Sequence, residues 1–288
     1  MIARLGYKRV VLSLHHDATD REVVQAAAEL ALLFGLDLHG IFVEDEEVLG
    51  LADLPFAREI RLPTHEWAPL SAEQVAREFE HTAEEIRRLL ADVAGALGVS
   101  IVFERLRGNP ITEPTAHIQP SDIFVVVEPV KARALMADRF LRLCEAAFRS
   151  RGGVMFLPPR ADRRKGPIIV AARNWSDPTL ELAARVAAAA DEGLLALLPE
   201  APPDANQDAL KDRLIREGAA EDRIEIRTIG AVTQETIIST LGTGPARLLI
   251  VSRSILGEDG VVASQLAARS GVPVLVAEPE ENTERIAS

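Results

Sequence analysis

The stretch Arg247–Glu278, RLLIVSRSILGEDGVVASQLAARSGVPVLVAE, decides the fold of this chain. The apolar run Leu248–Val251 has the length of a buried strand, and Pro273–Ala277 is a second such run. Between them, a loop with two glycines leads into apolar residues at helical spacing. A strand, a short helix and a strand in so few residues form a βαβ unit, which requires a parallel sheet. Ligands bind such sheets at the carboxyl ends of the strands, so the loop after Val251 is the first place to look for a site.

The composition narrows the classes of function. The chain has 288 residues, 48% hydrophobic and only 4% aromatic, so it can build a large aliphatic core. Its formal net charge of -12 disfavours nucleic-acid binding, because phosphate contacts need clustered Lys and Arg. The single cysteine, Cys144, cannot form an intrachain disulfide and fits a reducing compartment. The sequence has no signal-like apolar leader and no membrane-spanning stretch, so we expect a cytoplasmic protein with no membrane or nucleic-acid partner.

The same order of strands and helices occurs twice. In the first half we expect strands at Arg9–Leu14, Leu38–Val43, Ser100–Leu106, Asp122–Val127 and Val154–Leu157, with helices between them. After a linker rich in Pro and Arg, Pro158–Gly166, the pattern restarts with Pro167–Ala172, Leu194–Leu198 and Ile224–Ile229, followed by the quoted stretch. This duplication predicts two domains, residues 1–159 and 166–288. Residues 44–70 interrupt the first, and we interpret them as an insertion that lies over the domain or its partner.

Several motifs resemble those of the tandem universal stress proteins, and the resemblance covers both halves. They are a helix motif at Glu22–Ala31, glycine turns at Gly108 and Gly230, the strand Asp122–Val127, and GVPVLV at Gly271–Val276. The resemblance implies an α/β fold with two doubly wound, five-stranded parallel sheets in the order 3-2-1-4-5, like the adenine nucleotide alpha hydrolases. It also implies dimer-like pairing of the domains, which a tandem chain can achieve internally.

The fifth strand of each half is apolar throughout and would lie at an edge of its sheet in this order. Exposed apolar edges promote aggregation, so they must be covered. We therefore expect the two fifth strands to meet each other in an intrachain pseudo-dimer.

Nucleotide-binding members of the family that the chain resembles carry a loop G-x2-G-x9-G-[ST] after strand four and an Asp at the end of strand one. Such glycines let backbone amides approach phosphates at a helix N-terminus. This chain departs from the motif, since residues 122–151 contain no glycine. Phe140 and Leu141 stand near the G-[ST] position of the first half, Gly260 and Val261 near that of the second, and His15 and Arg173 replace the two Asp residues.

We therefore expect no cofactor in the first half, and at most a modest ATP or anion site in the second. The candidate ligand-binding residues are Arg173, Asn174, Ser252, Arg253, Ser254 and Gly260. The arginines supply positive charge at the carboxyl ends of strands one and four, and Gly260 opens a helix. The alternative interpretation is that these are ordinary exposed loop residues.

Other polar clusters favour structural interpretations. Adjacent side chains of an extended segment point in opposite directions, so His15-His16-Asp17 indicates a helix-entry turn rather than a metal site. The acidic run Glu44–Glu47 is typical of a solvated loop rather than a cation site, and His65-Glu66-Trp67 of an interface patch. Cys144 lies in an apolar helical stripe and belongs to the core. We find no set of nucleophile, base and acid, and expect no enzyme activity.

Three functions are consistent with the sequence. The first is a non-catalytic tandem universal stress protein-like module that acts in stress response through protein contacts or weak ligand binding, and that is compatible with a homo-oligomer. The second is an ATP-binding protein with one site in the second half. The third is an enzyme of the related adenosine-phosphate hydrolase class, which would need a catalytic signature that this sequence does not display.

Overall fold

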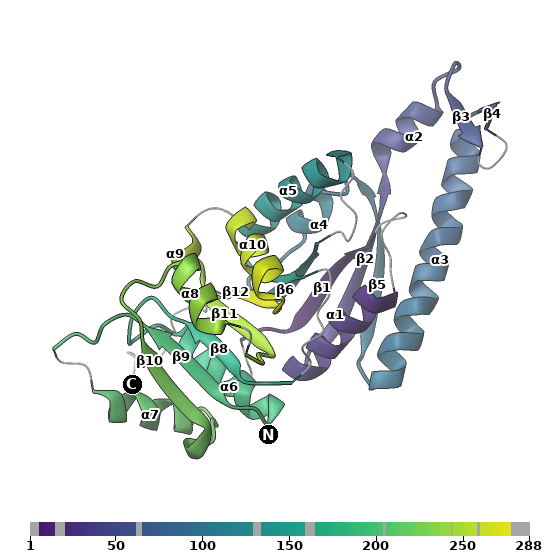
Figure 1. The fold of residues 1–288 in the computed structure, drawn as a ribbon. Coiled ribbons are helices and arrows are strands. Elements are labelled where there is room, and N and C mark those ends of the chain that lie inside the picture. The colour runs from purple at the N-terminus through teal and green to yellow at the C-terminus, as the bar shows by residue number, and fades with distance from the viewer. Residues whose placement is uncertain are drawn as a thin grey trace, which may run out of the picture.

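One ten-stranded sheet runs through the molecule in the computed structural model (Figure 1). The structure describes residues 6–14, 21–61, 65–128, 134–158, 165–203, 206–242, 244–257 and 260–277. The first half contributes β1 (Arg9–Leu14), β2 (Asp37–Asp45), β5 (Ile101–Gly108), β6 (Asp122–Val127) and β7 (Gly153–Leu157). The second half contributes β8 (Ile168–Ala171), β9 (Leu194–Leu198), β10 (Ile224–Thr228), β11 (Leu248–Ser252) and β12 (Val274–Ala277).

The strand order follows the prediction in each half. Across the sheet it is β10-β9-β8-β11-β12-β7-β6-β1-β2-β5, so each half has the order 3-2-1-4-5. All pairs within a half are parallel. Strands buried on both faces read as continuous apolar runs, which is why β6, β9 and β11 could be recognised from the sequence.

The two halves join through their fifth strands. β12 pairs with β7 in the antiparallel direction, with Leu275 opposite Met155 and Val276 opposite Val154. The predicted meeting of the fifth strands is therefore confirmed. The expectation of two separate five-stranded sheets is wrong, because this pairing satisfies the backbone groups of both edges and makes one sheet. The domain limits 1–159 and 166–288 stay a prediction, since residues 159–164 of the linker lie outside the described residues.

Helices cover both faces of the sheet (Figure 1). One face packs against α1 (Arg21–Phe34), α3 (Ala72–Leu97), α6 (Thr179–Ala190) and α7 (Gln207–Arg216). The other face packs against α4 (Thr112–Ala116), α5 (Ala134–Arg149), α8 (Gln234–Leu241), α9 (Arg253–Leu256) and α10 (Gly260–Ser270). A single 3-10 turn, Glu221–Arg223, precedes β10. Helix α1 contacts α6 on one face and α5 contacts α10 on the other, so both hydrophobic cores continue across the junction.

A buried ion pair fixes the register of the first half at the amino ends of its strands. The Asp122 carboxylate is 1% exposed and accepts hydrogen bonds from Arg9 Nε at 2.8 Å and Nη2 at 2.9 Å. The backbone N–H of Gln119 also donates to Asp122 Oδ2 at 2.8 Å. A carboxylate buried this deeply needs such partners, because an unpaired charge is costly to desolvate. The pair therefore ties β1 to β6.

The segment that the sequence left irregular forms an arm. We define the arm as residues 46–61 and 65–70, comprising α2 (Glu46–Ala52) and the antiparallel hairpin of β3 (Arg58–Arg61) and β4 (Glu66–Pro69). It continues from the carboxyl end of β2 and returns through α3, and together with the outer part of α3 it projects away from the sheet (Figure 1). The expectation that this insertion lies over its own domain is therefore wrong.

Helix α3, which follows the arm, packs against the sheet through one apolar stripe in its sequence. Its buried stripe, Val75, Phe79, Ala83, Ile86, Leu90 and Val93, has a spacing of three or four residues. The ring of Phe79 meets the ring of Phe42 in β2 edge-to-face, with 6.3 Å between centroids. Gly98 ends the helix in a left-handed conformation, with φ 71°. Among the described helices, none is long and apolar enough to cross a membrane.

The junction between β7 and β12 gives a first prediction. Leu275 is fully buried in the middle of β12, so Leu275→Lys should lower the free energy of unfolding by about 3–5 kcal/mol through lost packing and an unpaired buried ammonium group. Urea unfolding of the whole chain measures this change. Leu32→Lys is the control, since Leu32 is 51% exposed and should tolerate the charge. Equal stability of the two variants would contradict the role of the junction.

Candidate functional site

The place to look for a site is the carboxyl edge of the sheet, where strands one and four of each half lie side by side. In doubly wound sheets this is the point at which the strand order reverses and ligands bind. In the second half β8 pairs with β11, and Ala171 lies opposite Val251. The structure therefore brings the ends of these two strands together, with Arg173 and Asn174 after β8 and Ser252 as the last residue of β11.

Arg173 and Asn174 lie in an exposed turn that is fixed by the buried side chain of Asp177. The backbone N–H of Arg173 donates to Asp177 Oδ2 at 2.9 Å, and Asp177 is only 2% exposed. Asp177 Oδ1 also accepts from the backbone N–H of Thr179 at 3.0 Å and from its hydroxyl at 2.8 Å. Asp177 thus caps the start of α6 and fixes the turn. The side chain of Arg173 remains exposed at the edge of the sheet, where it can meet an anion.

The hydroxyl groups at the end of strand four pair with each other. Ser252 is buried, and its Oγ lies 3.1 Å from Oγ of Ser254, which is exposed. These two hydroxyls and the Arg173 turn are the part of the predicted set that the structure gathers at one edge.

Arg253 has a different environment from the one that the sequence suggested. Its guanidinium group donates to the carbonyl oxygen of Phe148, and to that of Gly152 at 2.7 Å. It also lies over the Phe148 ring, 4.9 Å from the centroid. These carbonyls belong to the end of α5 and the turn after it, in the other half of the chain. Arg253 therefore ties the two halves together, and places its charge at the negative end of a helix.

Gly260 also belongs to the contact between the halves. It is buried at the first position of α10, and a Cβ atom added there would lie 2.4 Å from the Cys144 carbonyl oxygen and 3.0 Å from Phe148 Cβ. Glycine is required because the backbone of α10 approaches α5 this closely. The structure thus assigns both Arg253 and Gly260 a packing role between the two halves.

In the first half, the same edge of the sheet carries the Glu128 carboxyl group. Ser13 Oγ in β1 and Glu128 Oε2 after β6 are buried and have no hydrogen-bond partner in the described part of the chain. Burial raises the pKa of the Glu128 carboxyl above its usual value. His15, the predicted neighbour at the end of β1, lies outside the described residues, as do His16 and Asp17. A carboxyl group here disfavours a phosphate.

The position expected for the first-half phosphate loop is helical. Phe140 is half-buried against the core, and Leu141 is 41% exposed; both lie within α5. Cys144, one turn further, is fully buried in the core, as predicted. A continuous helix leaves no run of free backbone amides at these positions, because its interior N–H groups bond to carbonyls one turn earlier.

Two acids at the end of β2 were misjudged from the sequence. Glu44 and Asp45 were expected in a solvated loop, yet both are buried, because β2 continues to Asp45. Glu44 accepts hydrogen bonds from Arg105 and from Arg107 Nη2, the latter at 3.1 Å. Asp45 caps α2 through the Glu47 N–H at 3.0 Å and lies 3.6 Å from Arg139 Nη2. The alternation of Arg105 and Arg107 was the signal for this cluster, since residues two apart on a strand share a face.

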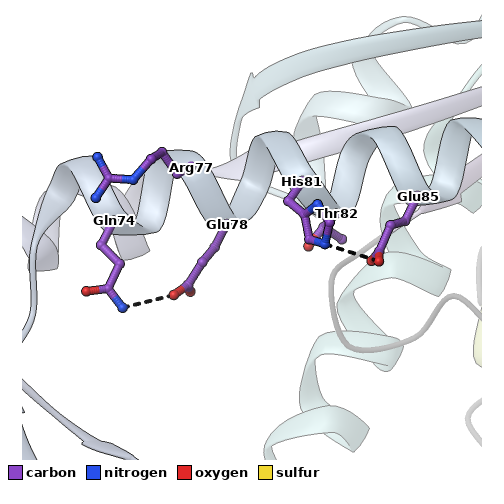
Figure 2. Close-up of a pocket in the computed structure, with 6 residues that line it drawn as sticks. All are labelled: Gln74, Arg77, Glu78, His81, Thr82 and Glu85. Atoms are coloured by element: carbon purple, nitrogen blue, oxygen red, sulfur yellow. Dashed lines mark hydrogen bonds and ion pairs between the residues drawn. The ribbon is translucent and has the colours of Figure 1, made fainter.

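A shallow hollow on α3 is lined by one helix alone (Figure 2). Its residues are Gln74, Arg77, Glu78, His81, Thr82 and Glu85. Gln74 donates to Glu78 at 3.1 Å, and His81 Nε2 lies 3.2 Å from Glu85 Oε1. These pairs at i and i+4 are the ordinary support of an exposed helix. In the described part of the chain, no three His, Cys, Asp or Glu residues are grouped to hold a metal ion.

The close approach of α10 to α5 gives a second prediction. Gly260→Ala should lower the free energy of unfolding by about 1–3 kcal/mol, because the new methyl group meets a backbone carbonyl. Gly95→Ala is the matched control, since nothing lies within 4 Å of a Cβ at that position of α3, and it should raise stability by about 0.5–1 kcal/mol. Urea unfolding compares the two. A neutral Gly260→Ala would show that the helices are not in close contact.

The Glu128 carboxyl gives a pH-dependent prediction. Its pKa is higher in the folded than in the unfolded chain, so its charged form opposes folding, and this cost appears as the pH rises above the unfolded value. Glu128→Gln should therefore be more stable than the parent at pH 7.5, and the difference should shrink towards about pH 4. Urea midpoints at both pH values measure it. Glu145→Gln, at an exposed position of α5, is the matched control.

Solved structures with the same architecture identify the fold. No protein-family model matches this chain, and no curated protein sequence matches it significantly. A universal stress protein from Archaeoglobus fulgidus DSM 4304 is 16% identical, with a TM-score of 0.61 over 93% of this chain and 96% of that chain. A putative universal stress protein from Pseudomonas aeruginosa UCBPP-PA14 is 14% identical, with a TM-score of 0.53 over 96% of this chain and 95% of that chain.

A functionally unknown protein from Pseudomonas aeruginosa PAO1 is 13% identical, with a TM-score of 0.52 over 96% of this chain and 94% of that chain. Each similarity extends over both halves of the chain, since it covers more than nine-tenths of it. Identities this low establish architecture rather than function. The chain therefore has the α/β fold of the universal stress proteins.

Proposed function

We propose that this chain is a tandem universal stress protein, made of domains 1–159 and 166–288, that acts in stress response without catalysis and through protein contacts. One observation carries the proposal: Arg253 and Gly260, two of the six residues expected at a ligand site, hold the two halves together. A guanidinium group that already donates to two carbonyl oxygens is not available to neutralise a phosphate. These two residues thus support the internal pseudo-dimer instead of binding a ligand.

The Glu128 carboxyl group in the first half supports the same proposal. Glu128 stands where a nucleotide-binding loop would begin, and no glycine follows it before residue 152. A carboxyl group and a continuous helix are poor partners for a triphosphate. We therefore propose that the first half binds no ATP.

The alternative function, one ATP or anion site in the second half, depends on Arg173. This side chain is exposed beside Asn174 and the Ser252 and Ser254 hydroxyls, which together offer one charge and several hydrogen-bonding groups. Such a set suits a small anion better than a nucleotide, because it provides no glycine loop for three phosphates.

Calorimetric titration of the whole chain with Mg-ATP, combined with native mass spectrometry of the purified protein, tests the proposal. We expect no co-purifying nucleotide and no saturable heat at about 100 µM protein, a level at which micromolar binding is readily seen. Micromolar binding would contradict the proposal, and Arg173→Ala then decides the alternative.

If Arg173→Ala abolishes the heat while Arg227→Ala, an exposed arginine on the edge strand β10, does not, the second half is an ATP site. Arg253→Ala is unsuitable for this purpose, because it would also loosen the contact between the halves.

A further inference from the structure

The arm carries a concentration of exposed apolar side chains. Leu51, Leu54, Phe56, Ile60 and Trp67 are 57%, 40%, 76%, 50% and 60% exposed. Together they present on the order of 500 Å² of apolar surface, if a free aromatic side chain offers about 150–250 Å² and an aliphatic one somewhat less. Patches of about 300–600 Å² are the largest found on ordinary monomers and are often functional.

The hairpin at the tip of the arm has its apolar face turned outward. Ile60 in β3 lies directly opposite Trp67 in β4, and both are at least half exposed. The next pair, Glu59 and Ala68, points to the other face and is half-buried. Water-facing positions of a hairpin normally carry polar residues, whereas this one exposes a Trp–Ile pair. The pattern indicates that the outer face meets another surface.

The two edge strands of the main sheet carry charged residues, in contrast to the outer face of the hairpin. Edge strand β5 alternates Glu104, Arg105 and Arg107 with apolar residues, and edge strand β10 carries Glu225 and Arg227. Charges of this kind prevent a further strand from adding to an edge. The β7 and β12 edges are already paired with each other. The outer face of the arm's hairpin instead exposes the apolar pair Ile60 and Trp67, so we turn to it for a contact between molecules.

We propose that the outer face of the arm, centred on Ile60 and Trp67, is a self-association surface on which a second copy of this chain docks about a two-fold axis. A two-fold contact buries the same patch on both copies. If the contact covers the five exposed apolar side chains of both arms, it buries on the order of 1,000 Å², about the area that a specific interface needs.

The position of the arm fits this arrangement. It projects beyond the carboxyl end of β2 and away from the sheet, so two arms can meet while the acidic bodies stay apart (Figure 1). Arg58 lies on the same outer face as Ile60 and Trp67, beside Pro69. Trp and Arg are the residue types most enriched among the energetic centres of protein interfaces. This inference does not depend on the proposed function, because it concerns a different surface.

Analytical ultracentrifugation of the whole chain tests the proposal. We expect a species of twice the 31.2 kDa chain mass, with a dissociation constant in the micromolar range that an interface of this size gives. Ile60→Glu combined with Trp67→Glu should weaken association at least about 100-fold, since two central apolar anchors are lost. Leu32→Glu is the matched control, because Leu32 is 51% exposed on α1, far from the arm, and should leave association unchanged.

Trp67 fluorescence provides a second measurement that needs no disruptive change in the arm. In Trp175→Phe, Trp67 is the only remaining tryptophan, and its emission should shift to longer wavelength on dilution with the same midpoint as the mass. A chain that stays monomeric at about 100 µM overturns the proposal, because a dimer with a micromolar dissociation constant would be mostly associated at that concentration. A dimer that survives the double Glu variant, or that forms without a change at Trp67, also overturns it.

Discussion

The antiparallel pairing of β12 with β7 is the contact on which the rest of the structure depends. Each half taken alone would end in a buried, apolar strand with an unpaired edge. The backbone groups of both edges are satisfied by pairing with each other, which is the strongest directional constraint available. The pairing also sets α1 against α6 and α5 against α10, so the two cores become continuous across the junction.

At this junction, Arg253 and Gly260, which were expected to bind a ligand, contact the other half of the chain. A helix N-terminus with a nearby arginine is a ready anion site only where it faces solvent. In this chain α10 begins against α5, and Arg253 donates to carbonyls at the end of that same helix. The charge and the glycine are the ones expected of a phosphate site, yet their partners are protein atoms. Function therefore has to be argued from what each group contacts, and not from the fold.

The first half differs from the second half at the carboxyl end of its second strand. The β2 strand extends to Asp45, where buried acids are balanced by arginines from β5 and α5. Because these acids are paired, β2 can continue to Asp45, and α2 follows it directly. The same extension places the arm away from the sheet, and among the residues that the structure describes only the first half has such an arm. The two halves thus share an architecture while offering different surfaces to other molecules.

The sequence by itself determined the strands, the amphipathic helices and the duplication, because continuous apolar runs such as Asp122–Val127 and stripes such as that of α3 are local signals. The strand order followed only from the resemblance to the universal stress proteins. The sequence also indicated that the fifth strands must be covered. Only the tertiary structure decided that one sheet results, that Glu44 is buried by two arginines sixty residues away, and that Gly260 contacts a helix of the other half. The hairpin of the arm was missed as well, since its strands are short and lack a strong turn signal. Each of these features depends on which distant surface meets a residue, and local periodicity does not carry that information.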